Sequence, residues 1–113
     1  MSKQTVINQL LIMGVPMHTK GFLFLVDALT IILEDMEGLY DLTRTVYPQI
    51  AARYNTDVKN VDRCLRTTLQ TTWQTGNLPY LEEYFAQYRN SASGKTTVSC
   101  FLSVVANRLA YQV

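Results

Sequence analysis

The chain has 113 residues, of which 48% are hydrophobic and 17% charged, and its formal net charge at pH 7 is +1. This composition is typical of a globular protein and excludes a disordered or linker-rich chain, while the length suits one domain, residues 1–113, with a single core. The charge is nearly balanced in total, so its distribution along the chain says more about possible partners than its sum does.

Two helices are predicted on either side of a loop that contains glycine and proline. A short helix over 5–13 is expected to end at Gly14, because glycine commonly closes a helix and Pro16 cannot continue it. From Gly21 to Met36 apolar residues recur every three or four positions, which predicts the central helix of the core. Its longest apolar stretch is too short for a membrane span of about 20 residues, and the N-terminus does not resemble a signal peptide, so we expect a cytoplasmic protein with no membrane partner.

The remaining elements are also expected to be helical. They are a segment from Asp41 or Thr43 through Val46, helices over 48–54 and 58–75, a short helix with Leu81, Tyr84 and Phe85, and a last helix over 97–109. Pro48 suits a first helical turn, and either Thr56 or Asp57 can cap the long helix. The sequence therefore predicts an all-α, compact fold of about six helices with no convincing strand.

Residues 48–75 have the pattern of a helix-turn-helix, in which a second helix reads the DNA major groove. A tight turn is expected at 55–57, and the small Ala51 lets the two helices approach closely. The side chains expected to face inward are those of Ile50, Tyr54, Val61 and Leu65.

The opposite face of the predicted helix over 58–75 is polar and basic. Between Arg44 and Arg66 there are five bases and two acids, a local balance of +3. Arginine pairs with guanine and Asn or Gln with adenine, so such a face suits base reading, although an ordinary solvated helix face has the same appearance. The residues expected to read or grip DNA are Lys59, Asn60, Arg63, Arg66 and Gln70, with Arg53, Thr67 and Thr75 as candidates for backbone contacts.

Other possible sites receive little support from the sequence. Cys64 and Cys100 lie far apart, with His18 as the single possible nitrogen ligand, so we expect two buried reduced thiols and no metal. Gly94-Lys95-Thr96 imitates the end of a phosphate-binding loop but lacks the first glycine and the preceding strand. His18 is expected to be structural, and no enzymatic activity or cofactor is predicted.

Several segments resemble one known family, in the same order as in that family. GVPMHTKGF at 14–22 resembles its GVPxHxKGY motif, VYPQIA at 46–51 resembles LYPxIA, and YNT at 54–56 resembles FNT. Further matches are VDR at 61–63 with Arg66, Trp73, Gly76-Asn77 and the closing segment 101–109. Over nearly its whole length the chain resembles the C-terminal effector domain of stage-zero sporulation protein A, the response regulator of endospore formation.

The resemblance implies a six-helix fold whose fourth helix enters the major groove. It also implies transcription regulation through head-to-tail pairs of domains on tandem DNA boxes and through contact with the sigma factor of RNA polymerase. The family's receiver domain has no counterpart here, so the chain is either an excised effector domain or a stand-alone paralogue. The positions that match the family's DNA contacts are Lys59, Asn60, Asp62, Arg63, Arg66 and Thr67.

Some of these positions depart from the family pattern. Asp62 stands where the family usually has Glu, Thr67 where it has His, and Thr75 where it commonly has Arg, while Cys100 replaces an acid. We therefore expect a different preferred box and a lower affinity. The alternative is a protein-interaction module that keeps the fold and modulates a full-length regulator without binding DNA strongly.

Overall fold

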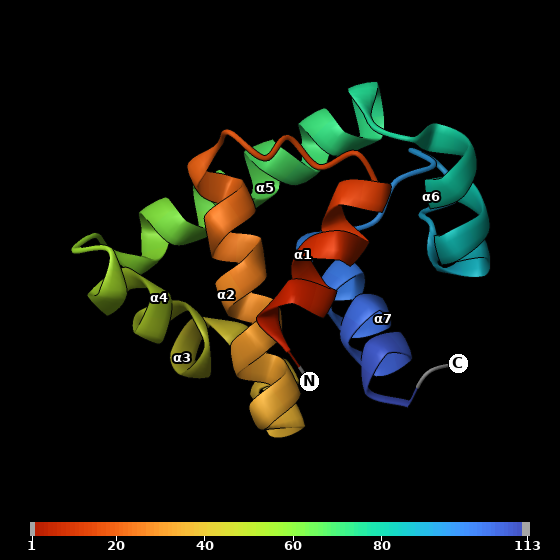
Figure 1. The fold of residues 1–113 in the computed structure, drawn as a ribbon. Helices are drawn as coiled ribbons and strands as arrows, with labels where there is room; N and C mark the ends of the chain where they lie inside the picture. Colours follow the sequence, from red (N-terminus) through yellow and green to blue (C-terminus); the bar gives the residue numbers. More distant parts are fainter. Residues whose placement is uncertain (1, 112–113) are drawn as a thin grey trace.

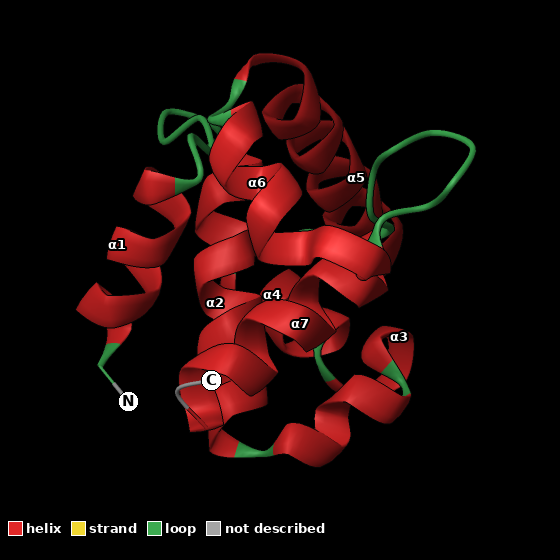
Figure 2. Cartoon of the chain, turned by 90° about the vertical axis from the view of Figure 1, so that its right-hand side faces the viewer, coloured by secondary structure: helices red, strands yellow, loops and turns green. Residues whose placement is uncertain are grey.

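The computed structural model describes residues 2–111, and within them the chain is helical with no strand (Figures 1 and 2). Six helices have seven residues or more, and a single-turn helix, α3, and two 3-10 helices complete the set. The prediction of an all-α fold with about six helices is confirmed. The elements are α1 (Lys3–Ile12), α2 (Lys20–Glu34), η1 (Met36–Tyr40), α3 (Leu42–Thr45), α4 (Tyr47–Arg53), α5 (Val58–Thr75), α6 (Leu78–Phe85), η2 (Ala86–Tyr88) and α7 (Val98–Tyr111).

The core forms around α2, which contacts α1, α4, α5 and α7. Leu25, Leu29 and Ile32 of α2 are fully buried, and so are Phe101 and Leu102 of α7. Burying apolar surface of this kind is the main stabilising contribution to a small domain. The expectation that 21–36 holds the central core helix is confirmed, although α2 ends at Glu34, because Asp35 adopts an extended conformation and caps η1 instead.

The α2–α5 crossing depends on a glycine. A Cβ atom built on Gly21 would lie 1.7 Å from Oγ1 of Thr68 and 2.7 Å from the carbonyl oxygen of Cys64. Real atoms do not approach so closely, so α2 and α5 can come this near only because residue 21 has no side chain. Gly21 therefore fixes the depth at which α5 rests on the core.

The loop between α1 and α2 holds the C-terminal end of α5. Gly14 has a φ of +80°, which favours glycine, and a Cβ on it would lie 2.8 Å from the backbone of Gly76. The N–H of Asn77 donates to the carbonyl oxygen of Met13 at 3.0 Å. In Figure 1 this loop passes along α5 at the top of the molecule. The middle of α5 and its C-terminal end are therefore both tied to elements from the first third of the chain.

Three details differ from the sequence expectations. Helix α1 begins at Lys3 and not at residue 5, because the hydroxyl of Ser2 accepts a hydrogen bond from the N–H of Thr5. Tyr54 is 37% exposed and does not face fully inward. Cys64 and Cys100 are free, but both are only half-buried, since each lies at the edge of its helix's buried face.

Candidate DNA-binding surface

Helices α4 and α5 are joined by a four-residue turn that hydrogen bonds hold in place. Asn55 has a φ of +53°, a conformation that Asn tolerates better than most residues. The N–H of Thr56 donates to the carbonyl oxygen of Ala51 at 2.9 Å, and Asp57 caps α5 by accepting from the N–H of Asn60 at 2.7 Å. The expected turn, the cap and the long helix at 58–75 are all present.

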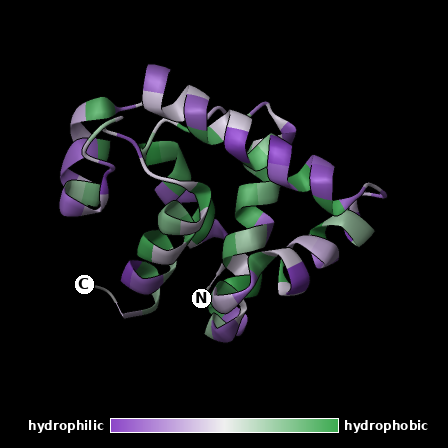
Figure 3. Cartoon of the chain, turned by 180° about the vertical axis from the view of Figure 1, so that it is seen from behind, coloured by the Kyte–Doolittle hydropathy of each residue, from purple (hydrophilic) through white to green (hydrophobic). Residues whose placement is uncertain are grey.

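The outer stripe of α5 carries the predicted base-reading side chains. Val61 and Leu65 are buried beneath it, which fixes the orientation of the helix. Figure 3 shows α5 as more hydrophilic than α2 and α7, as expected for a helix with one face in water. The stripe consists of four exposed residues on one side of the helix: Lys59, Arg63, Arg66 and Gln70.

Asn60 organises the first turn of α5. Its Nδ2 donates to Oγ1 of Thr56 at 2.9 Å, and its Oδ1 accepts from the guanidinium of Arg63. Asn60 is half-buried, and both atoms of its side-chain amide already have hydrogen-bond partners in the free protein. These contacts hold Arg63 on the outer stripe, but Asn60 must exchange a partner before it can bind a base.

Asp62 and Arg66 form an ion pair one turn further along, with 2.6 Å between Oδ2 and Nη2. The side chain of Arg66 is exposed and that of Asp62 is partly exposed, and ion pairs of this kind contribute little to stability in water. Their effect is on position, since the carboxylate draws the guanidinium of Arg66 toward one flank of α5. Thr67, the last residue implied by the resemblance, is exposed on the other side of the stripe.

Arg53 lies in different surroundings from the other predicted DNA-binding residues. Its Nη1 is 3.1 Å from Oδ1 of Asp27, a carboxylate only 2% exposed, which also accepts a hydrogen bond from the hydroxyl of Tyr54 and lies 3.8 Å from Nζ of Lys3. Partial desolvation of its hydroxyl, followed by the hydrogen bond to Asp27, raises the pKa of Tyr54 to about 12. In the sequence, the sign of this cluster was Asp27, a charged residue within the apolar stretch 22–33, but the sequence pattern does not show which residues it pairs with.

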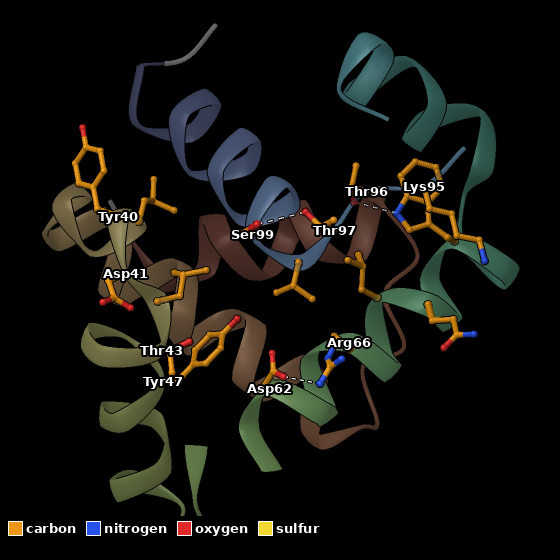
Figure 4. A pocket seen from close by; sticks show the side chains of 16 residues that line it. Tyr40, Asp41, Thr43, Tyr47, Asp62, Arg66, Lys95, Thr96, Thr97 and Ser99 are labelled. Carbon is orange, nitrogen blue, oxygen red and sulfur yellow. Dashed lines mark hydrogen bonds and ion pairs between the residues drawn. The ribbon is translucent and has the colours of Figure 1, made fainter. Parts of the chain in front are cut away.

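A groove of about 870 Å³ opens along the flank of α5 that carries Asp62 and Arg66 (Figure 4). Its other walls are η1 with α3 and the first turn of α7. Tyr47, only 4% exposed, lies at its inner side, and burial, followed by the nearby charge of Asp62, raises the pKa of this phenol to about 12. Nothing in the sequence pattern predicts this groove, because its walls come from three separate segments.

The helix α6 presents a second surface, made of aromatic and acidic side chains. The guanidinium of Arg108 in α7 lies 4.0 Å from the ring centre of Tyr84, a distance typical of a cation–π contact. Burial raises the pKa of the Tyr84 phenol to about 12. Glu82, Glu83 and Tyr88 are exposed on the same element or directly after it. The combination of acids and exposed aromatic surface is typical of protein contacts.

Two other features singled out in the sequence lie in loops outside the helix-turn-helix. His18 is exposed in the α1–α2 loop, and 94–96 lies in the loop before α7. Within residues 2–111 there is no cluster of side chains able to hold a metal ion, and no helix that is both long and apolar enough to cross a membrane.

A family comparison matches residues 6–109 of this chain to the family described as sporulation initiation factor Spo0A C terminal. The match covers nearly the whole chain, including both helices of the helix-turn-helix and the aromatic α6. Helix α5 is the fourth of the helices longer than one turn, as the family resemblance implied. The family is one of transcription-factor domains and is not a family of enzymes. The chain therefore belongs to this family of sporulation-related DNA-binding effector domains.

Proposed function

We propose that the protein binds specific sequences of double-stranded DNA with α5 in the major groove, and thereby regulates transcription. The observation that carries the proposal is the exposed stripe of Lys59, Arg63, Arg66 and Gln70 on a helix whose other side is anchored in the core. A rigidly placed helix that presents donors in this way is the usual means of reading base edges.

Within this proposal the side chains have different tasks. Arg63 and Gln70 read bases, since both are exposed on the stripe and neither is paired with an acid. Lys59 lies in the first turn of α5 and meets a phosphate, where the helix N-terminus also favours negative charge. Asp62 positions Arg66 and sets which bases it can reach. Arg53 holds the turn in place through Asp27 and contributes less to binding than the sequence suggested.

The acidic and aromatic surface of α6 supports a second role, contact with another protein. We propose the sigma factor of RNA polymerase as one partner, and head-to-tail pairing of two domains on tandem DNA boxes as another, which would bring the protein to the nucleoid. The alternative, an interaction module without useful DNA affinity, is favoured by the same surface and by the near-zero net charge.

The test is a comparison of wild type and Arg63→Ala. A preferred duplex is selected from a random pool, and binding to it and to a scrambled duplex is measured by fluorescence anisotropy across a salt series. We expect wild type to prefer the selected duplex and Arg63→Ala to lose about 1 to 3 kcal/mol of that preference, because one bidentate base contact is removed.

The matched control is Arg108→Gln, which removes one positive charge from the last helix, α7, where the guanidinium lies over the ring of Tyr84 in α6. It should leave the preference unchanged. If no duplex is selected and wild type binds all duplexes equally weakly, specific DNA recognition is contradicted, and binding to purified sigma factor becomes the deciding measurement for the alternative.

A further inference from the structure

The groove beside α5 has the side chains of an anion-binding site. Arg66 and Gln70 line it from α5, and Lys95 lines it from the loop before α7. Two carboxylates also line it, but each has a basic partner: Asp62 pairs with Arg66 at 2.6 Å, and Asp41 lies 3.6 Å from Nε of Arg44. Lys95 has no acidic partner among residues 2–111, so its charge is available to a ligand.

The first turn of α7 faces the same groove. Thr97, Val98 and Ser99 line it, and the hydroxyl of Thr97 caps the helix by accepting from the N–H of Cys100 at 3.1 Å. The N–H groups of Val98 and Ser99 belong to the first turn and have no acceptor within the helix. Unpaired N–H groups at the start of a 14-residue helix favour an anion, above all a phosphate.

An independent observation indicates that the groove receives a ligand. Tyr47 is 4% exposed, and its hydroxyl has no hydrogen-bond partner within the described part of the chain. Figure 4 shows its ring reaching into the groove from the side opposite Thr97 and Ser99. The hydroxyl itself is not enclosed, because every fully buried side-chain nitrogen or oxygen among the described residues has a hydrogen-bond partner. It therefore opens into the groove, where it can donate to a ligand. Its donor is aimed at the space that Lys95 and the α7 N-terminus border.

The position of the groove identifies the source of the phosphate. A helix with its side chains is about 10 to 12 Å across, and the major groove of DNA is about 12 Å wide, so the two sugar-phosphate strands must pass close along the two flanks of α5. One flank is the rim formed by Arg66 and Gln70. We propose that a backbone phosphate of the bound DNA enters this groove and is held by Lys95, the Tyr47 hydroxyl and the N-terminus of α7.

This inference rests on the proposed function, and it adds a contact made by residues outside the helix-turn-helix. Such a contact should strengthen binding to every duplex by a similar factor and carry no sequence preference. It should also fix the angle of α5 in the major groove, since the DNA is then held at the stripe and at one strand of its backbone.

The test uses Lys95→Gln and Tyr47→Phe, with Arg108→Gln as the charge control. For Lys95→Gln we expect roughly tenfold weaker binding to selected and scrambled duplexes alike, and a slope of log K against log salt smaller by about 0.9, because one phosphate contact is lost. Tyr47→Phe keeps the ring and should weaken binding roughly threefold with the slope unchanged, since a hydroxyl donor and not a charge is removed. Circular dichroism verifies that each variant is folded.

A second measurement locates the phosphate. The affinities of wild type and Lys95→Gln are measured for a set of duplexes, each with one phosphate replaced by an uncharged methylphosphonate. One position should weaken wild type but have no further effect on Lys95→Gln, as expected for two partners in one contact. If wild type and Arg63→Ala behave as proposed but Lys95→Gln keeps the wild-type slope, the phosphate site is wrong while the DNA-binding function stands; if wild type selects no duplex, the proposed function itself fails.

Discussion

Arg53 and Arg63 have the same side chain but different surroundings. Arg53 is held by the buried Asp27, although 57% of its side chain remains exposed, whereas Arg63 is on the outer stripe and contacts Asn60. Their roles should therefore separate in experiment: one arginine stabilises the turn that leads into α5, and the other is available for DNA.

We expect Arg53→Ala to lower the free energy of unfolding by about 1 to 2 kcal/mol, because it leaves Asp27 with one partner fewer, discounted for the exposure of the guanidinium. Arg63→Ala should change stability by no more than about 0.5 kcal/mol, as is usual for an exposed position. Urea unfolding of both variants, next to the DNA titrations, measures the two effects. A larger loss of DNA preference for Arg53→Ala than for Arg63→Ala would contradict this division.

At the residue scale the sequence predicted side chains that recur with a helical period, but it did not predict individual contacts between residues far apart in the chain. The stripe from Lys59 to Gln70 follows from spacing along one helix. The pairing of Asp27 with Arg53 joins positions 26 residues apart, and nothing in the local pattern distinguishes that partner from any other base. The free phenol of Tyr47 was missed for the same reason, since its environment comes from α5 and α7.

At the scale of elements, the crossing of α2 and α5 determines how far the outer stripe of α5 projects from the core. The crossing depends on Gly21, whose missing side chain leaves room for Thr68 and for the backbone of Cys64. Shortening Thr68 alone cannot make room for a larger residue 21, because the Cβ atom of residue 68 and a backbone oxygen would remain too close.

Gly21→Ala should therefore lower the free energy of unfolding by about 2 kcal/mol or more, as in other overpacked helix contacts, and should weaken DNA binding in proportion to the displacement of α5. Gly94→Ala is the matched control. Its added Cβ meets nothing within 4 Å, so only its φ of +74° opposes alanine, at a cost of roughly 1 kcal/mol. Chemical denaturation compares the two, and equal losses would show that the close approach is relieved elsewhere.

The helices themselves were predictable because capping residues and breakers mark their ends. Asp57 and Gly76 bound α5 at the expected residues, and the turn at 55–57 is where the sequence placed it. The single-turn α3 and the 3-10 helices η1 and η2 are too short for a period to identify them. They matter nevertheless, because η1 and α3 form one wall of the groove beside α5.

At the scale of the whole molecule, buried and partly buried phenols make the free energy of unfolding depend on pH in the alkaline range. Tyr47 and Tyr84 have pKa values raised to about 12, mainly by burial, against an ordinary value of 10.0. Between these values the unfolded chain has lost the phenol proton while the folded chain keeps it. The unfolded state then binds fewer protons, so the free energy of unfolding falls as pH rises.

We expect stability to be unaffected by these tyrosines below about pH 10 and to decline from there toward pH 12. One phenol shifted by two pKa units contributes up to about 2.7 kcal/mol to the decline by pH 12. Tyr47→Phe should show a correspondingly shallower fall, measured by urea unfolding at intervals of half a pH unit from 9 to 11.5. The same slope in both proteins would mean that Tyr47 ionises in the folded state as easily as in the unfolded chain.

The contact between the α1–α2 loop and the end of α5 joins residues that the ribosome synthesises at different times. Nδ2 of Asn77 donates to the carbonyl oxygen of Ile12, 65 residues earlier in the chain. While the protein emerges from the ribosome, α1 and α2 are free well before Gly76 and Asn77 appear, and closing so long a loop is slow compared with forming a helix. A nascent chain can therefore form α5 before the C-terminal end of that helix is anchored to the α1–α2 loop.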